Sequence, residues 1–106
     1  MKRIAAGALI GLIAGVIDVV PMVARGLPWS ANGSAFLMWI VVGVIVAVSD
    51  FGLPAAVHGI VVGFLVLAPS AILIGAVEPL SLLPISVMTL LLGSGVGVAA
   101  RRLIKA

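Results

Sequence analysis

Cysteine and tyrosine are absent from the chain, and histidine and acidic residues are rare. Without cysteine the protein has no disulfide, no thiol nucleophile and no thiolate metal site. The three acidic residues and the single histidine are scattered along the sequence, so no metal site is expected. The sequence also contains no nucleophile–base pair and no phosphate-binding loop. We therefore expect a protein that is not an enzyme and that holds no cofactor.

Charge is too scarce for a soluble protein. Only 8% of the residues are charged and 64% are hydrophobic, whereas a soluble domain has about 25% charged residues. A surface with so few charges is poorly solvated by water, so the sequence predicts an all-α integral membrane protein. The net charge of +3 comes mostly from the chain ends. That distribution is typical of membrane topology and does not indicate nucleic-acid binding.

The hydrophobic residues fall into four segments, and each is close to the ~20 residues that cross a bilayer. Glycine, proline and asparagine separate the segments and favour turns there, including one at Asn32-Gly33-Ser34. We expect the first segment to be retained as a span, because it carries Asp18 and lacks a signal-peptide cleavage site. The chain is thus predicted to be one membrane domain, residues 1–106, with a four-helix bundle. The predicted spans are Ile4–Ala24, Ala35–Val48, Leu53–Ala76 and Leu82–Ala100.

Basic residues lie at both ends of the chain. Lys2 and Arg3 precede the first segment, and Arg101, Arg102 and Lys105 follow the last. Four spans place both ends on the same side of a membrane, and the positive-inside rule makes that side cytoplasmic. The sequence therefore predicts a multi-pass protein of the cell membrane with both termini in the cytoplasm.

The other charged residues lie near the predicted turns. Asp50 and His58 belong to the cytoplasmic turn, and Arg25 and Glu78 belong to the outer connections. An ion pair between Arg25 and Glu78 fits this topology, as does a pair of Asp50 with His58 or Arg101. A lone histidine at the start of a helix is interpreted as structural.

The two halves of the sequence resemble each other at offsets of 48 to 51 residues. Such a duplication predicts two tandem two-helix repeats in parallel orientation, related by an axis along the membrane normal. Asp18 has no acidic counterpart, because Val66 occupies the equivalent position. The matched pairs are Gly11 and Gly59, Gly15 and Gly63, Pro21 and Pro69, Pro28 and Pro79, Ser30 and Ser81, Met38 and Met88, and Gly43 and Gly93.

Small residues recur every four positions in the predicted helices. In lipid, where no hydrophobic force draws helices together, glycine allows the close backbone approach that gives van der Waals contact. We interpret these positions as helix-packing residues within the bundle, and an interface between copies of the chain is the alternative. The glycines concerned are Gly7, Gly11, Gly15, Gly59, Gly63, Gly93 and Gly97.

Asp18 is the principal candidate for function. It lies on the same helical face as Gly7, Gly11 and Gly15, and an acid within a span faces protein or water rather than lipid. Pro21 follows within one turn and frees a backbone carbonyl at a similar depth. We expect Asp18 to be a proton-coupling or cation-binding group; the alternative is a structural acid bonded to another helix.

Polar side chains on the fourth segment are the natural partners for such an acid. Ser86 and Thr89 share a narrow face with Gly93 and Gly97, and we include both hydroxyls among the proton- or cation-binding candidates. Hydroxyls in lipid usually bond to a neighbouring helix or to their own backbone, which is the competing interpretation. Trp39 is interpreted as a packing residue, with an aromatic wall for substrate as the alternative.

The general plan is similar to that of the small multidrug resistance transporters, which have about this length, four spans and one acid in the first helix. In that family the acid is a glutamate accompanied by aromatic residues, tyrosine among them. Here the acid is Asp18, and the aromatic content is 5% without tyrosine. The resemblance is therefore one of architecture and does not imply drug transport.

Two functions are compatible with these features. The first is a homo-oligomeric transporter or channel for a small solute or ion, with Asp18 coupling to protons or binding a cation. The second is a structural or assembly subunit of a larger membrane complex that has no transport activity. The expected partners are the lipid bilayer and either further copies of the chain or other membrane subunits, and no nucleic acid.

Overall fold

The computed structural model describes residues 2–104, which form four long helices. They are α1 (Lys2–Ala24), α2 (Trp29–Val48), α3 (Ala55–Val77) and α4 (Leu82–Leu103), with a short 3-10 helix, η1 (Pro79–Ser81), before α4. Each of the four is long and apolar enough to cross a membrane. The prediction of an all-helical protein with four long apolar helices is confirmed. Lys105, one of the predicted basic residues at the C-terminal end, lies outside the described residues.

Helix α2 begins six residues before the predicted segment, at Trp29. Pro28 precedes it with an extended backbone, and its carbonyl oxygen accepts a hydrogen bond of 3.1 Å from the backbone N–H of Asn32. The turn predicted at Asn32-Gly33-Ser34 is therefore wrong. Proline fixes the backbone just ahead of the helix, and once the first turn has closed the following polar residues continue it.

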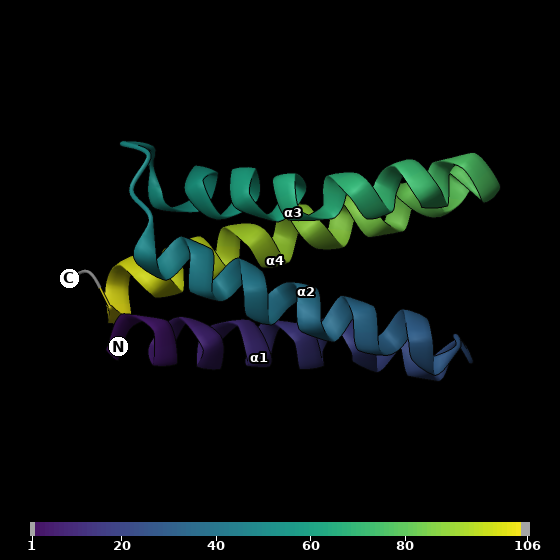
Figure 1. The fold of residues 1–106 in the computed structure, drawn as a ribbon, viewed down its shortest axis with the longest axis horizontal. Coiled ribbons are helices and arrows are strands. Elements are labelled where there is room, and N and C mark those ends of the chain that lie inside the picture. The colour runs from purple at the N-terminus through teal and green to yellow at the C-terminus, as the bar shows by residue number, and fades with distance from the viewer. Residues whose placement is uncertain (1, 105–106) are drawn as a thin grey trace.

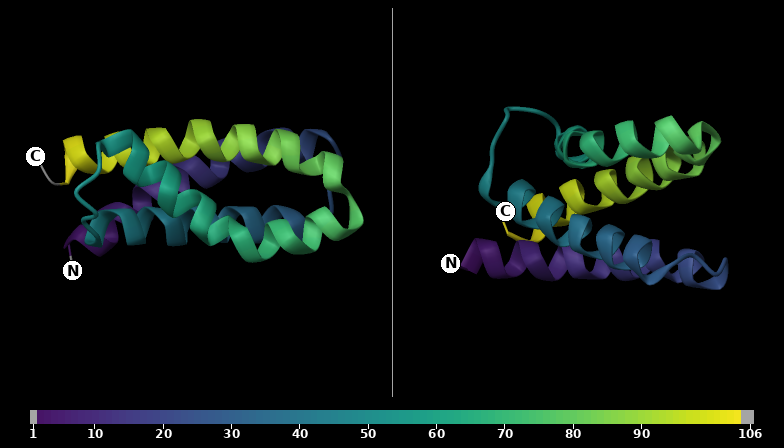
Figure 2. Two further views of the ribbon diagram at one scale, coloured as in Figure 1. Left: turned by 90° about the horizontal axis from the view of Figure 1, so that it is seen from above. Right: turned by 45° about the vertical axis from the view of Figure 1, so that its right-hand side comes forward.

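The helices pair as two antiparallel hairpins that form two layers (Figure 1). Packing within each hairpin, α1 with α2 and α3 with α4, is more extensive than packing between the hairpins. Residues near both chain ends and the connection 49–54 lie at one end of the bundle, called here the terminal end. The connections 25–28 and 78–81 lie at the opposite end, called the far end. The hairpins are close at the terminal end and separate toward the far end, as the right-hand view of Figure 2 also shows.

Glycines hold α1 against α2. A Cβ added to Gly7 would lie 2.6 Å from the carbonyl oxygen of Gly43, and one added to Gly11 would lie 2.7 Å from the Cα of Ile40. Contacts this short leave no room for any side chain. The predicted packing role of the α1 glycines thus corresponds to backbone-to-backbone contact with α2.

Glycines also bring α3 and α4 into backbone contact, and their sequence positions show how the second hairpin corresponds to the first. A Cβ on Gly97 would collide with the carbonyl oxygen of Ala55 and lie 2.9 Å from the nitrogen of Gly59. A Cβ on Gly43 would meet Gly7 and Gly11 in the corresponding way. Gly59 follows Gly11 by 48 residues, whereas Gly97 follows Gly43 by 54. The contacts therefore match Gly43 with Gly97 rather than with Gly93, and the duplication itself stays a prediction.

The terminal end is fastened by hydrogen bonds between helices and the α2–α3 connection. Arg101 donates to the carbonyl oxygen of Leu53 over 2.7 Å. His58 is 2% exposed, and its Nε2 lies 2.9 Å from Oγ of Ser49. The ring centroids of Phe51 and His58 lie 4.8 Å apart. These contacts agree with the structural interpretation of His58.

Candidate functional site

Asp18 is hydrogen-bonded to the indole of Trp39. The Nε1–H of Trp39 donates to Oδ2 of Asp18 over 2.9 Å, which joins α1 to α2. Trp39 is 1% exposed, whereas Asp18 is half-buried. The carboxylate therefore has a fixed donor on one side and remains partly accessible on the other.

The contact depends on how side chains lean in an antiparallel hairpin. Trp39 lies opposite Gly11, and Asp18 is seven residues further along α1, or about 10 Å along the axis. Side chains on a helix lean toward its N-terminus. In antiparallel helices the Asp18 and Trp39 side chains therefore lean toward each other, and together they span the distance.

Trp39 also reaches the second hairpin. Its Cη2 atom lies 3.9 Å from the position that a Cβ would take on Gly63 of α3. The methyl group of Thr89 on α4 lies 3.2 Å from the same position. One indole thus bonds to the acid of α1 at one edge and lies close to the α3–α4 hairpin at the other.

Ser86 and Thr89 are not brought into hydrogen-bond contact with Asp18. The Thr89 hydroxyl is buried and donates to the carbonyl oxygen of Ile85 in its own helix over 2.8 Å. Ser86 is half-buried on the same helix. Within residues 2–104, the hydrogen bond of Asp18 is with Trp39. Thr89 therefore contributes to the arrangement through its methyl group against Gly63.

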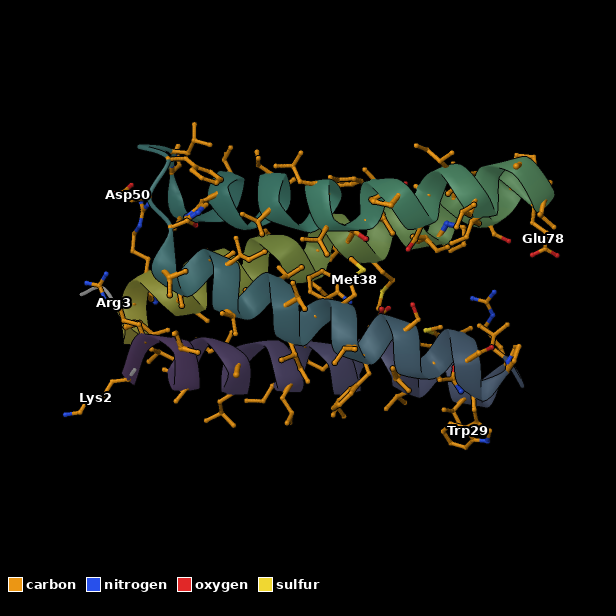
Figure 3. All side chains as sticks on the ribbon, viewed as in Figure 1. Lys2, Arg3, Trp29, Met38, Asp50 and Glu78 are labelled. Atoms are coloured by element: carbon orange, nitrogen blue, oxygen red, sulfur yellow. The ribbon has the colours of Figure 1, made fainter. Side chains whose placement is uncertain are left out.

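The charged residues at the ends of the bundle lie away from Asp18. Glu78 at the far end accepts a 3.2 Å hydrogen bond from Ser81, and among the described residues 2–104 no ion pair joins Glu78 to Arg25. Lys2, Arg3 and Asp50 lie at the terminal end, while Trp29 and Glu78 lie at the far end (Figure 3). Across the part of the chain that the structure describes, no three metal-ligating side chains gather.

Two polar residues of the hairpin were missed as site residues in the sequence. Trp39 was interpreted as packing, yet a buried indole N–H needs an acceptor, and Asp18 is the one acid within a predicted span. That need was a usable signal. Local sequence rules predict a turn at Asn32, but Asn32 is 3% exposed within the first turns of α2. Its burial follows from the early start of α2, for which the sequence gives only the weak signal of Pro28.

No protein-family model matches the chain, and no curated protein and no solved structure is significantly similar to it. Functional assignment therefore depends on the geometry around Asp18.

Proposed function

We propose that the chain is a multi-pass membrane protein that works as a homo-oligomeric transporter or channel for a small solute or ion. In this proposal Asp18 binds the coupling proton or a cation. The observation that carries it is the hydrogen bond from Trp39 to Asp18 inside a largely apolar bundle. Keeping an acid within a span is costly, and such residues commonly serve proton or ion pathways.

The arrangement offers a way to convert binding at Asp18 into movement. A proton or cation at the carboxylate neutralises its charge and so weakens Oδ2 as the acceptor of the Trp39 N–H. Trp39 contacts Gly63 of the second hairpin, and the hairpins separate toward the far end (Figure 1). A shift of the indole would therefore change how the two hairpins meet, while the glycine contacts keep each hairpin rigid.

The orientation belongs to the same proposal. Lys2, Arg3, Arg101 and Arg102 lie at the terminal end, close to the ends of α1 and α4. The positive-inside rule places this end in the cytoplasm. Asp18 is six residues from the end of α1, so it lies about 9 Å from the outer limit of that helix. The half-buried carboxylate is thus nearer to the outer water than to the cytoplasm.

Flux through proteoliposomes tests the role of Asp18. Proton flux is followed with an entrapped pH-sensitive dye under an imposed membrane potential, and cation flux with radioactive Na⁺. We expect Asp18→Asn to lower the coupled flux by at least about tenfold, since the amide carries no exchangeable charge. Asp50→Asn is the matched control, because Asp50 is an exposed loop acid. Equal flux in the Asp18→Asn protein and the wild type at every pH would exclude the coupling role.

One observation favours the alternative of an assembly subunit. An apolar groove of about 280 Å³ runs between α1 and α4, lined in part by Ile13, Ile17, Gly95 and Ala99. Nothing lies within 4 Å of the position of a Cβ on Gly95, so packing within the chain does not use this glycine. The groove is thus open to side chains of a partner helix. Native mass spectrometry of the purified protein separates the two functions, because a defined homo-oligomer favours transport and an unstable monomer favours a missing subunit.

A further inference from the structure

The groove between α1 and α4 is apolar and open to the surroundings of the bundle. Its volume is about 280 Å³, and Gly95 widens it, because nothing lies within 4 Å of the position of a Cβ there. Packing between α1 and α4 is less extensive than packing within either hairpin. Side chains that line an unfilled space lack van der Waals partners, so a group that fills this groove would stabilise it.

The length of the groove fits one leaflet of a bilayer. On α4 the lining extends from Leu92, at the middle of the helix, to Leu103, its last residue, and on α1 it lies within Ile10–Ile17. Leu103 follows Leu92 by eleven residues, which is about 16 Å along a helix and about half of a ~30 Å hydrocarbon core. A lipid tail spans this depth, whereas a partner helix that crosses the membrane would need a groove along the whole of α4.

Two arginines continue the groove face at the terminal end. Arg3 precedes Ile10 by seven residues, and Arg102 follows Gly95 by seven. Seven residues are close to two helical turns, so each arginine shares the face of its lining residue. Both are exposed, and Figure 3 shows Arg3 at the terminal end. The apolar groove therefore leads toward a pair of positive charges.

These charges decide which lipid is preferred. Lipid tails are as apolar as the groove itself, so hydrocarbon contact alone selects no particular lipid. Arginine side chains bind phosphate oxygens through paired hydrogen bonds, and basic residues beside a membrane attract anionic head groups. Arg101 is different, because it donates to the carbonyl oxygen of Leu53 within the protein.

We propose that the α1–α4 groove binds one anionic phospholipid from the leaflet at the terminal end. One acyl chain lies in the groove beside Gly95, and the phosphate lies between Arg3 and Arg102. The volume, the depth and the position of the charges each fit this occupant. Neither Asp18 nor Trp39 lines the groove, so the inference goes beyond the proposed function and does not depend on it.

Native mass spectrometry of the full chain in a mild detergent measures the affinity for added lipid. Dioleoyl phosphatidylglycerol and dioleoyl phosphatidylcholine have the same tails, and only the first has a net negative charge. Separate titrations with the two lipids therefore isolate the head group. We expect the first phosphatidylglycerol to bind at least about tenfold more tightly than phosphatidylcholine, because each arginine beside the phosphate contributes about fivefold.

Variants of the two arginines test the head-group contact. The double variant Arg3→Gln with Arg102→Gln is expected to reduce the preference for phosphatidylglycerol to less than about threefold. Arg25→Gln is the control, because it removes an exposed arginine at the far end and should leave the preference unchanged.

A variant of Gly95 tests the place of the tail without changing any charge. Gly95→Leu fills the groove and is expected to weaken the binding of phosphatidylglycerol by about fivefold or more. Gly33→Leu is the matched control, since Gly33 is an exposed glycine of α2 that also has nothing within 4 Å of a Cβ. It should bind the lipid as the parent does.

Three results would overturn the lipid site. The first is equal affinity for the two lipids, or a preference that survives the loss of both arginines. The second is phosphatidylglycerol binding that Gly95→Leu leaves unchanged, which would place the tail elsewhere. The third is a homo-oligomer that shows no lipid preference and that Gly95→Leu dissociates, since a second copy of the chain would then occupy the groove. The arginine variants change only exposed side chains, so they decide even if Gly95→Leu does not fold.

Discussion

At the scale of the residue, the central feature is that a single donor fixes the acid. Asp18 is half-buried, and Trp39 gives it one hydrogen bond of 2.9 Å. Trp39 is also 1% exposed and lies beside Gly63 of α3, so packing as well as this bond holds the indole in place. A shift of the ring would therefore alter its packing beside the second hairpin.

A double-mutant cycle measures this bond. Trp39→Phe keeps an aromatic ring but removes the N–H and part of the indole, and Asp18→Ala removes the acceptor; the cycle cancels the loss of packing that each single variant causes. We expect each variant to lower the free energy of unfolding in mixed micelles, with a coupling energy of about 1 kcal/mol between them. Trp29→Phe is the control, because Trp29 is exposed at the far end. A coupling energy near zero would contradict a structural or functional link between the two side chains.

At the scale of the element, glycines decide which helix faces meet. Gly97 and Gly95 are two residues apart on α4, yet only Gly97 touches another helix, at Ala55 and Gly59. Gly95 opens into the groove beside α1. The same residue type therefore has opposite consequences two positions apart, since successive residues point in different directions on a helix.

The substitution pair Gly97→Ala and Gly95→Ala tests this difference. Gly97→Ala forces a methyl group into the backbone of α3 and is expected to cost about 1–3 kcal/mol of unfolding free energy. Gly95→Ala meets no atom and is expected to be neutral or to stabilise the protein by up to about 1 kcal/mol, because alanine favours helix. Thermal unfolding in one detergent compares the two. Equal destabilisation would contradict the packing of α3 against α4.

At the scale of the whole molecule, the two hairpins form separate layers that meet most closely at the terminal end (Figures 1 and 2). The helices of each hairpin touch backbone to backbone, whereas packing between the hairpins is less extensive. Relative motion of the hairpins is thus expected to centre on the connection 49–54, with the far end moving most.

Single-cysteine labelling tests the proposed topology, and the cysteine-free sequence makes every introduced thiol unique. With a membrane-impermeant maleimide on intact cells, we expect Arg25→Cys and Glu78→Cys at the far end to react. Lys2→Cys and Asp50→Cys at the terminal end should react only after permeabilisation. All four positions are exposed, so labelling reports the side and not burial. Labelling of the Asp50→Cys protein from outside would reverse the orientation.

Much of this architecture was predictable from the sequence because it depends on local properties. Hydropathy and segment length predicted four long helices, and the glycines at four-residue spacing predicted a packing face on α1 that does contact α2. The predicted start of α2 is too late, because the polar residues and glycine after Trp29 have local propensities that favour a turn. The burial of Asn32 was not predictable for the same reason.

The partner of Asp18 was decided only by the tertiary structure. A sequence places Asp18 on the glycine face, but its contact with Trp39 depends on the register of α1 against α2 and on the lean of both side chains. That register is set where Gly7 and Gly11, two to three turns before the acid on α1, meet Gly43 and Trp39 of α2. Helices close their hydrogen bonds locally, so the sequence by itself determined the elements. Side-chain partners between helices depend on how whole helices are shifted and rotated relative to each other. Only the tertiary structure determined that placement.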